Sequence, residues 1–167
     1  MLKMKVIQIS PNRNDVAAIM NKSAEYAANL YPPESNHLDD VSELSKPNVF
    51  FIGVFEGDQL IGTGAVKVLS HDQQYGEIKQ VFVLPEHRSK GAAKLIMNAL
   101  EKHLADMGVG SARLETGILQ PEAIGLYKKL GYMERSPFGE YKPDPLSIFM
   151  EKELLAETFI ASVGDRE

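Results

Sequence analysis

The stretch spanning residues 76–118 most constrains how this chain can fold. Residues 76–84 read as an apolar strand that ends at Pro85, and residues 112–118 read as another strand. Between them, over residues 91–107, apolar side chains recur at helical spacing. A strand, a helix and a second strand in one sheet predict a parallel βαβ unit with a right-handed crossover.

Further periodic segments flank this unit. They predict strands at residues 6–9, 49–55, 60–68, 132–133 and 146–150, helices over 14–30 and 121–130, and a loop with a short helix in 34–44. Two strand-like runs around Gly57 predict an antiparallel hairpin. Asn12 and Asn14 are expected to cap the first helix, which should end before Pro32. The result is a mixed α/β sheet.

The composition narrows the class of protein. The 167 residues suit one domain over 1–167, in which the tail 153–167 is too mixed to place. A net charge of -5 argues against a nucleic-acid partner. The chain has no cysteine, so disulfides, thiolate metal sites and a cysteine nucleophile are excluded. The four histidines lack metal-ligand spacing, and no apolar run approaches the ~20 residues of a membrane span. We therefore expect a cytoplasmic protein without a metal.

The turn between the strand and the helix of the βαβ unit consists of small and basic residues. Its sequence is Arg88-Ser89-Lys90-Gly91-Ala92-Ala93, followed by Lys94. A helix that starts here would aim unpaired backbone N–H groups and its positive dipole end at one point, which favours an anion. Taken alone, the turn is better explained as a plain helix cap. A P-loop lacks its Gly-Lys-Ser/Thr here, and a Rossmann fingerprint lacks its first glycine.

Three spaced motifs together resemble the GCN5-related N-acetyltransferase (GNAT) superfamily. Arg88, Gly91 and Ala93 match the family's Gln/Arg-x-x-Gly-x-Gly/Ala signature. Residues 76–83 resemble the strand before it, and residues 121–132 are similar to the pattern Ala-x-x-Leu-Tyr-x-x-x-Gly-Phe/Tyr. The resemblance covers residues 76–133 well. It implies a mostly antiparallel sheet of about six to seven strands flanked by helices, with the βαβ unit carrying the cofactor site.

The resemblance also implies that acetyl-coenzyme A is the co-substrate, bound between the strands that end near residues 84 and 118. The residues implied in binding it are Val81, Phe82, Val83, Arg88, Ser89, Lys90, Gly91, Ala92, Ala93, Lys94 and Gln120. The turn would hold the pyrophosphate, and the Val81 amide would polarise the acyl carbonyl. The main chain of Phe82 and Val83 would pair with the pantetheine arm like an added strand. The family often has asparagine near Gln120, so this contact departs from the pattern.

Transfer to an amine needs a proton acceptor, because only about one alkylammonium in a thousand is deprotonated at neutral pH. Related proteins often place a glutamate base where Glu77 lies, acting directly or through water. Because Glu77 precedes Val81 by four residues, period-two alternation predicts that both side chains lie on one side of the strand. A solvated Glu77, or one paired with Lys79, is the alternative.

Tyr127 is the candidate proton donor to the coenzyme A sulfur, as the resemblance implies. The alternative is a tyrosine that packs with Leu126 and Leu130 on an amphipathic helix.

The acceptor site is less defined by the sequence. Ser35, Asn36 and His37 fall where related proteins shape the acceptor pocket, although loop polarity also explains them. Tyr141 is a candidate pocket wall or a residue that packs over its loop. A small-molecule or peptide amine fits as acceptor. The resemblance also allows a homodimer, since dimers are common among related proteins.

These observations favour an acyl-coenzyme A-dependent N-acetyltransferase in which a primary amine attacks directly. A coenzyme A-binding sensor or partner domain with weak catalysis is the alternative, because a fold does not prove turnover. An unrelated anion-binding domain is a third interpretation.

Overall fold

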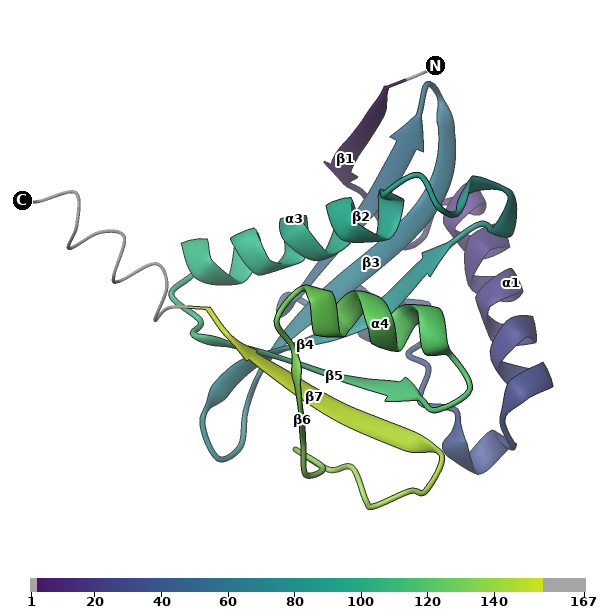
Figure 1. Cartoon of the computed structure of the whole chain (residues 1–167). Helices are drawn as coiled ribbons and strands as arrows, with labels where there is room; N and C mark the ends of the chain where they lie inside the picture. Colours follow the sequence, from purple (N-terminus) through teal and green to yellow (C-terminus); the bar gives the residue numbers. More distant parts are fainter. Residues whose placement is uncertain (1–2, 155–167) are drawn as a thin grey trace, which may run out of the picture. The chain divides into compact units, whose positions relative to one another are not determined.

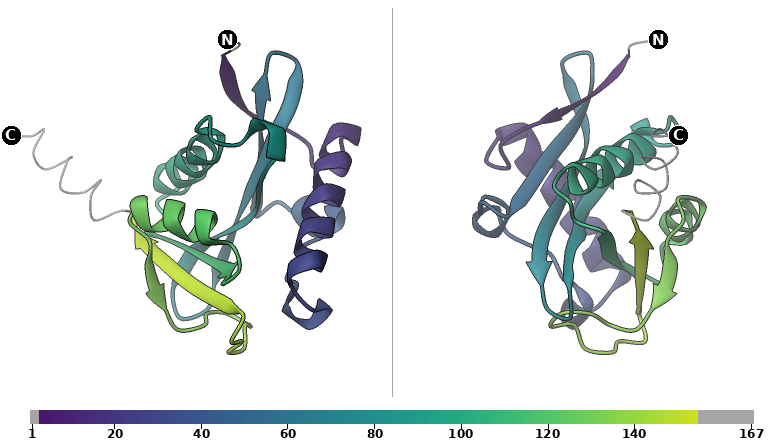
Figure 2. Two further views of the ribbon diagram at one scale, coloured as in Figure 1. Left: turned by 45° about the vertical axis from the view of Figure 1, so that its right-hand side comes forward. Right: turned by 90° about the vertical axis from the view of Figure 1, so that its left-hand side faces the viewer.

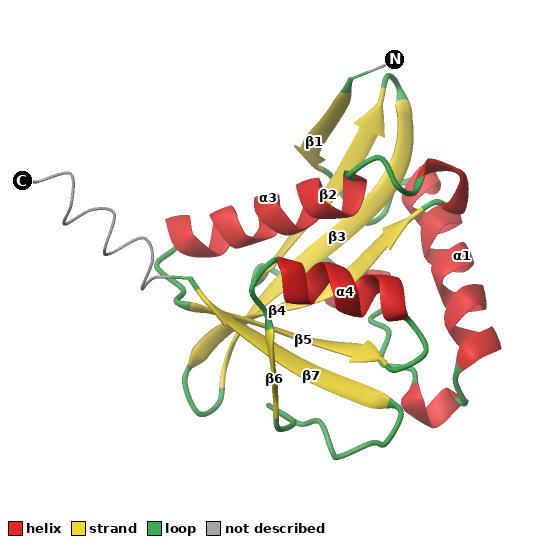
Figure 3. Cartoon of the chain, in the orientation of Figure 1, coloured by secondary structure: helices red, strands yellow, loops and turns green. Residues whose placement is uncertain are grey.

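The computed structural model describes residues 3–154. Within them, one sheet has the strand order β1-β2-β3-β4-β5-β7-β6 (Figure 1). The strands are β1 (Met4–Gln8), β2 (Val49–Glu56), β3 (Gln59–Ser70), β4 (Gln74–Val83), β5 (Ser111–Gly117), β6 (Met133–Arg135) and β7 (Ser147–Glu153). The helices are α1 (Asn14–Leu30), α2 (Val41–Leu44), α3 (Ala92–Asp106) and α4 (Pro121–Lys129), with 3₁₀ turns η1 (Pro33–Ser35) and η2 (Pro85–His87) (Figure 3).

The strand pairing confirms the predicted fold class. β1–β2, β2–β3, β5–β7 and β6–β7 pair antiparallel, whereas β4 pairs with β5 in parallel through Gly76 with Ala112 and Glu77 with Arg113. The helix α3 lies between these two parallel strands in the sequence, as the βαβ prediction requires. The predicted hairpin is also present, and its turn uses Gly57 at a φ of 60°.

Contacts divide the described residues into two compact units. The first comprises the described residues up to Lys67 together with Ile78–Leu100, and the second comprises Val68–Glu77 together with the described residues from Glu101 onward. The strand β4 and the helix α3 contribute residues to both units. One domain over the whole sequence stays a prediction, and most of the predicted tail 153–167 lies outside the described residues.

In the first unit, helices pack on both faces of the β2–β3 hairpin (Figure 2). On one face, α1 contributes Val16 and Ile19 to an apolar core with residues of both strands. On the other, the first turns of α3 approach β3 at Gly62 and Gly64. A Cβ at Gly64 would overlap the side chain of Ile96, so glycine lets the helix lie close to the strand.

The start of α1 differs from the prediction, although its end does not. The N-cap residue is Arg13, whose side chain makes no cap hydrogen bond and instead pairs with Asp15 at 2.9 Å. Asn14 is already the first helical residue, so the prediction that Asn12 and Asn14 cap the helix is wrong. The helix ends at Leu30, as Pro32 predicts.

The buried face of α3 also differs from the predicted one. Ala92, Ile96 and Leu100 are buried as their spacing predicts, but Met107 is 56% exposed. Met107 directly follows Asp106, the last residue of the helix, and its side chain projects into solvent there. The buried face is completed by Met97 and Leu104.

In the second unit, Arg113 lies almost fully buried on β5. Its guanidinium makes a paired hydrogen bond to Asp72, at 2.8 and 2.9 Å, and a third to Glu151 at 2.9 Å. Its Cζ also lies 4.4 Å from the centre of the Tyr75 ring. Because a buried charge is costly unless it is paired, these contacts account for an arginine inside the sheet. They also fix the loop at Asp72 that precedes β4.

Candidate active site: an anion-binding turn and a buried carboxylate

The turn before α3 is open and rich in unpaired backbone donors. Ser89 and Gly91 have positive φ values of 65° and 89°. The first helical hydrogen bond runs from the Leu95 amide to the Gly91 carbonyl, so the preceding N–H groups project from the helix start. A Cβ at Gly91 would meet no atom within 4 Å. The turn therefore has the geometry and polarity to hold an anion such as a pyrophosphate.

The basic side chains of the turn have separate partners. The Arg88 Nε donates to the Val83 carbonyl at 3.0 Å, and its guanidinium lies over the rings of Phe82 and Tyr26. The Lys90 ammonium instead pairs with Glu56 at 3.3 Å. The Arg88 side chain thus attaches the turn to β4, and Glu56 neutralises much of the positive charge of Lys90. Lys94 is exposed on the first turn of α3.

The strand β4 departs from extended backbone at Gln80, the residue before Val81. Gln80 has a φ of 56°, in the left-handed region that costs a non-glycine residue about 1–2 kcal/mol. Period-two alternation needs extended backbone at every residue, so the argument that Glu77 and Val81 share a side does not apply. Gln80 gave no sequence signal for this, because glutamine is not a residue typical of positive φ.

The predicted pantetheine-binding residues have buried side chains. Phe82 belongs to the apolar core of the first unit, and Val83 is buried as well. Only their main chain can therefore meet a ligand, which agrees with the kind of contact that the resemblance implies. The Val83 carbonyl already accepts the Arg88 Nε, which leaves one lone pair on that oxygen.

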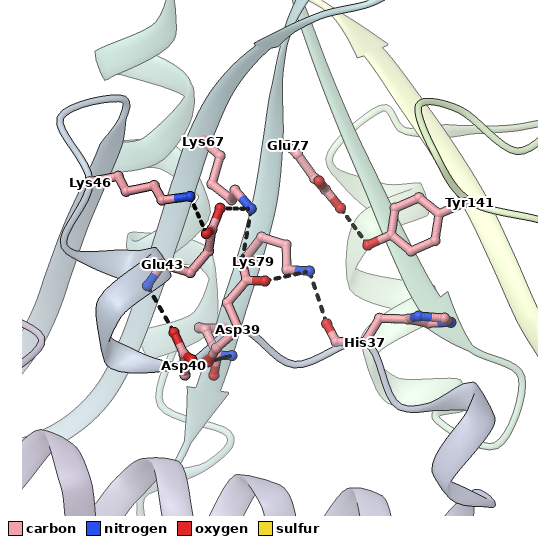
Figure 4. Close-up of polar contacts among 10 residues, drawn as sticks. His37, Asp39, Asp40, Glu43, Lys46, Lys67, Glu77, Lys79 and Tyr141 are labelled. Carbon is pink, nitrogen blue, oxygen red and sulfur yellow. Dashed lines mark hydrogen bonds and ion pairs between the residues drawn. The ribbon is translucent and has the colours of Figure 1, made fainter.

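The loop that carries the predicted acceptor residues is tied to β3 and β4. Ser35 is buried at the end of η1, and His37 is exposed. The Lys79 ammonium donates to the His37 carbonyl at 2.9 Å and lies 3.7 Å from the Asp39 carboxylate (Figure 4). Asn36 accompanies them in the same short segment.

A second lysine completes this attachment. Lys67 is 8% exposed, and its ammonium pairs with Asp39 at 3.1 Å and with Glu43 at 3.0 Å. Burial lowers the pKa of Lys67, but the hydrogen bonds that its ammonium donates to Glu43 and Asp39 outweigh this effect and raise the pKa overall. Lys46 and Lys67 lower the pKa of Glu43 to about 2. We call Asp39, Glu43, Lys67 and Lys79 the loop clasp.

In the second unit, Glu77 is a buried carboxylate with a short hydrogen bond. It is 5% exposed, and its Oε2 accepts the Tyr141 hydroxyl at 2.6 Å (Figure 4). The Tyr141 ring is held by Phe138 and Phe149, at centroid distances of 5.3 and 5.4 Å. The alternative of a solvated Glu77 is therefore wrong. The structure brings Tyr141, predicted as a pocket wall, into direct contact with the candidate base.

Tyr127 lies on α4 with its ring almost fully buried. Burial, followed by the negative charge of Glu115, raises the pKa of Tyr127 to about 12. Its ring meets Tyr132 edge-on, with 6.0 Å between centroids. Within residues 3–154 the Tyr127 hydroxyl has no hydrogen-bond partner, so it remains available as a donor. Gln120 precedes this helix as its N-cap residue, and its side chain makes no cap bond.

The described residues provide neither a metal-binding cluster nor a membrane-spanning helix. No cluster of three or more His, Cys, Asp or Glu side chains that could hold a metal ion occurs within residues 3–154. In that same part of the chain, no helix is both long and apolar enough to cross a membrane.

Comparison with known proteins identifies the family. The model of the acetyltransferase (GNAT) family matches residues 15–132. An IAA acetyltransferase of Azospirillum brasilense is 36% identical over 154 residues, which cover 92% of this chain and all of that protein. A crystal structure from Klebsiella pneumoniae, assigned as an acyl-CoA N-acyltransferase, superposes with a TM-score of 0.74 at 31% identity, covering 90% of this chain and 97% of the other.

A more distant structure shows the same fold with its cofactor. An aminoglycoside 6'-N-acetyltransferase in complex with coenzyme A has a TM-score of 0.69 at 16% identity, over 90% of this chain and 97% of its own. The family motifs, the parallel β4–β5 pair and these similarities agree. The resemblance drawn from the sequence is confirmed: this chain belongs to the GNAT family and is an N-acetyltransferase.

Proposed function

We propose that this N-acetyltransferase moves the acetyl group of acetyl-coenzyme A to a primary amine by direct attack. The observation that carries this proposal is the buried Glu77 carboxylate held by the Tyr141 hydroxyl at 2.6 Å. A buried carboxylate with a fixed orientation is suited to take a proton from an ammonium or from an intervening water. The chain has no cysteine, and no serine–histidine arrangement in its sequence indicates an acyl-enzyme, so the amine is proposed to attack the thioester itself.

The chemistry of the amine acceptor determines which protons must move during the reaction. An alkylammonium must lose a proton before its nitrogen can attack, and Glu77 accepts that proton. The amine nitrogen attacks the thioester carbonyl and forms the C–N bond; the resulting oxyanion collapses as the C–S bond breaks, and the electron pair leaves on the coenzyme A sulfur. The acetylated nitrogen gives its second proton to solvent as the neutral amide forms. The hydrogen bond from Tyr141 fixes the orientation of the carboxylate that receives this proton.

The cofactor is proposed to bind through main-chain groups of the turn and of β4. The N–H groups of residues 89–94 and the Arg88 side chain would hold the pyrophosphate, because this helix start is open and unpaired. The Val81 amide would polarise the thioester carbonyl. The main chain of Phe82 and Val83, with Gln120, would meet the pantetheine arm. The related aminoglycoside 6'-N-acetyltransferase binds coenzyme A, which supports this assignment.

Tyr127 is proposed to donate a hydrogen bond to the leaving sulfur. With a pKa of about 12, its phenol is protonated throughout the physiological range. A thiol has a pKa near ~8.5, so complete transfer of the phenol proton to a thiolate would be uphill by about 5 kcal/mol. We therefore assign Tyr127 the role of stabilising the developing thiolate, which then takes its proton from solvent.

A screen of acceptors tests the proposed function. The protein is mixed with acetyl-coenzyme A and a panel of primary amines, including amino acids, polyamines, an aminoglycoside and a short peptide, and thiol release is followed. IAA is tested as a further acceptor, because the relative from Azospirillum brasilense is an IAA acetyltransferase. Amine-dependent thiol release, with an acetylated product seen by mass spectrometry, supports the proposal. Binding of coenzyme A without release with any amine would favour the sensor alternative.

A further inference from the structure

The peptide between Gln80 and Val81 is held in an unusual conformation. Gln80 has a φ of 56°, and only one other non-glycine residue of the described chain, Ser89, has a positive φ. Backbone in this region persists only where surrounding contacts determine it. The contacts that hold Gln80 in this conformation also bear on the next amide along the chain, that of Val81, which is the proposed oxyanion donor.

A buried hydroxyl on β3 provides the first contact. The Thr63 Oγ1 donates to the Gln80 carbonyl oxygen at 3.1 Å, and Thr63 is 1% exposed. A second, longer contact comes from the Gln80 side chain, whose Nε2 donates to the Asp39 carbonyl at 3.4 Å. Because threonine is branched at Cβ, its χ1 angle is restricted and the hydroxyl is well fixed. Thr63 therefore fixes the carbonyl of the strained residue from within the core.

The geometry of the peptide bond transmits this constraint to Val81. The described backbone contains no cis peptide bond, so the Gln80–Val81 peptide is trans and planar. In a trans peptide the carbonyl oxygen and the N–H point in opposite directions. A carbonyl of Gln80 that points toward Thr63 thus directs the Val81 N–H away from Thr63.

We propose that Thr63 is a positioning residue that orients the Val81 N–H toward the thioester carbonyl of acetyl-coenzyme A. This inference rests on the proposed function, since it takes the Val81 amide as the donor to the developing oxyanion. Thr63 itself makes no contact with the reacting atoms in this proposal. Its hydroxyl sets the direction of a main-chain donor that every substitution of Val81 except proline would leave in place.

The kinetic test replaces only the hydroxyl. Thr63→Val keeps the branched shape and leaves the Gln80 carbonyl without this donor, and Thr63→Ser restores the hydroxyl. Ser111→Ala is the matched control, because the Ser111 hydroxyl is buried and has no partner within the described residues. With a primary amine from the screen, Thr63→Val should lower kcat about tenfold, because a donor that is only misaligned costs less than one removed. The KM for acetyl-coenzyme A should change less than about twofold, since the pyrophosphate turn is untouched.

A spectroscopic readout makes the test independent of turnover. In protein labelled with ¹⁵N-valine, acetyl-coenzyme A should move the Val81 amide proton downfield in the wild type and in Thr63→Ser. The shift should be smaller in Thr63→Val, and Ser111→Ala should behave as the wild type. A Thr63→Val enzyme with the kcat and Val81 shift of the wild type would overturn the inference.

The two failures are distinguishable. If the wild type acetylates no amine and its Val81 amide does not respond to acetyl-coenzyme A, the proposed function fails and takes the inference with it. If the wild type is active and its Val81 amide responds, but Thr63→Ser does not restore what Thr63→Val loses, only the inference fails. A loss of kcat in Thr63→Val that Thr63→Ser recovers, with a matching change in the Val81 shift, supports it.

Discussion

The Tyr141 hydroxyl donates a 2.6 Å hydrogen bond to the Oε2 of Glu77, although the two residues are 64 positions apart in the sequence. Glu77 lies on β4, and Tyr141 lies in the loop between β6 and β7. The loop is held in place by the aromatic contacts of Phe138 with Tyr75 and Phe149. The packing of one hydrophobic cluster thereby sets the orientation of a buried carboxylate.

Tyr141→Phe should lower kcat for amine acetylation about tenfold. The substitution keeps the ring and removes the hydrogen bond that orients the Glu77 carboxylate, an interaction that typically contributes about 1.5 kcal/mol or more. The measurement is kcat with a fixed amine at one pH. Tyr75→Phe, which changes another tyrosine of the same cluster, is the control; an equal loss of kcat there would show a general effect of the cluster.

Glu77→Gln should lower the rate of amine acetylation by about 10²–10⁴-fold if Glu77 is the base. Glutamine has nearly the same shape but cannot accept the ammonium proton. Binding of coenzyme A, followed by calorimetry, should change little, because the turn proposed to hold the pyrophosphate is a separate part of the chain. An unchanged pH–rate profile in this variant would remove Glu77 from the role of base.

Tyr127→Phe should reduce turnover while coenzyme A affinity is retained, because only the donor to the leaving sulfur is lost. The pKa of about 12 adds a pH criterion. A phenol that loses its proton only near pH 12 remains a donor below that value. Ionisation of Tyr127 should therefore not lower the rate of the wild type at any pH up to 10. Full activity of Tyr127→Phe would leave this residue as a packing element of α4.

Gly91→Ala should weaken coenzyme A binding about tenfold or more. Alanine at a φ of 89° is strained, and its methyl group would project into the open space where the pyrophosphate is proposed to bind. Gly108→Ala is a matched control, because Gly108 has a φ of 76° and equally open surroundings at the end of α3. Both variants should lose similar thermal stability, and only Gly91→Ala should lose affinity. Equal affinities, measured by calorimetry, would contradict the assignment of the turn.

Local signals in the sequence predicted the strands and helices, because each depends on neighbours in the chain. Gly57 marks the hairpin and Pro32 the end of α1, and both positions behave as their backbone preferences dictate. The N-cap of α1 was mispredicted because Arg13, not an asparagine, takes the extended position before the helix.

The geometry of the candidate site depends on contacts that no local pattern reveals. Glu77 and the turn were predicted from motifs, but the partner of Glu77 comes from a distant loop. The left-handed Gln80 is stabilised by Thr63, which lies 17 residues earlier. Such contacts form only when the sheet brings separate strands together. They therefore leave no local pattern of residue spacing from which a single sequence could predict them.

The loop clasp should contribute measurably to stability, mostly through Lys67. Lys67→Met removes the partner of two carboxylates and should lower the free energy of unfolding by about 2–3 kcal/mol, somewhat below the cost of breaking a fully buried pair. Lys46→Met is the matched control: Lys46 is the largest cause of the lowered pKa of Glu43, but its side chain is 55% exposed, so solvent screens the pair and its loss should lower the free energy of unfolding much less than the loss of Lys67 does. Urea unfolding at pH 7 measures both.

The pH dependence of this difference has a definite sign. The pKa of Glu43 is lowered from 4.5 to about 2 in the folded protein, so its contribution is complete above pH 4.5 and is lost as the pH falls toward 2. The pKa of Lys67 is raised, so its contribution persists at every pH below its ordinary value of 10.5. The gap in stability between the wild type and Lys67→Met should therefore shrink between pH 4.5 and pH 2. A gap that stayed constant over this range would show that Lys67 stabilises the loop by packing and not by its ion pairs.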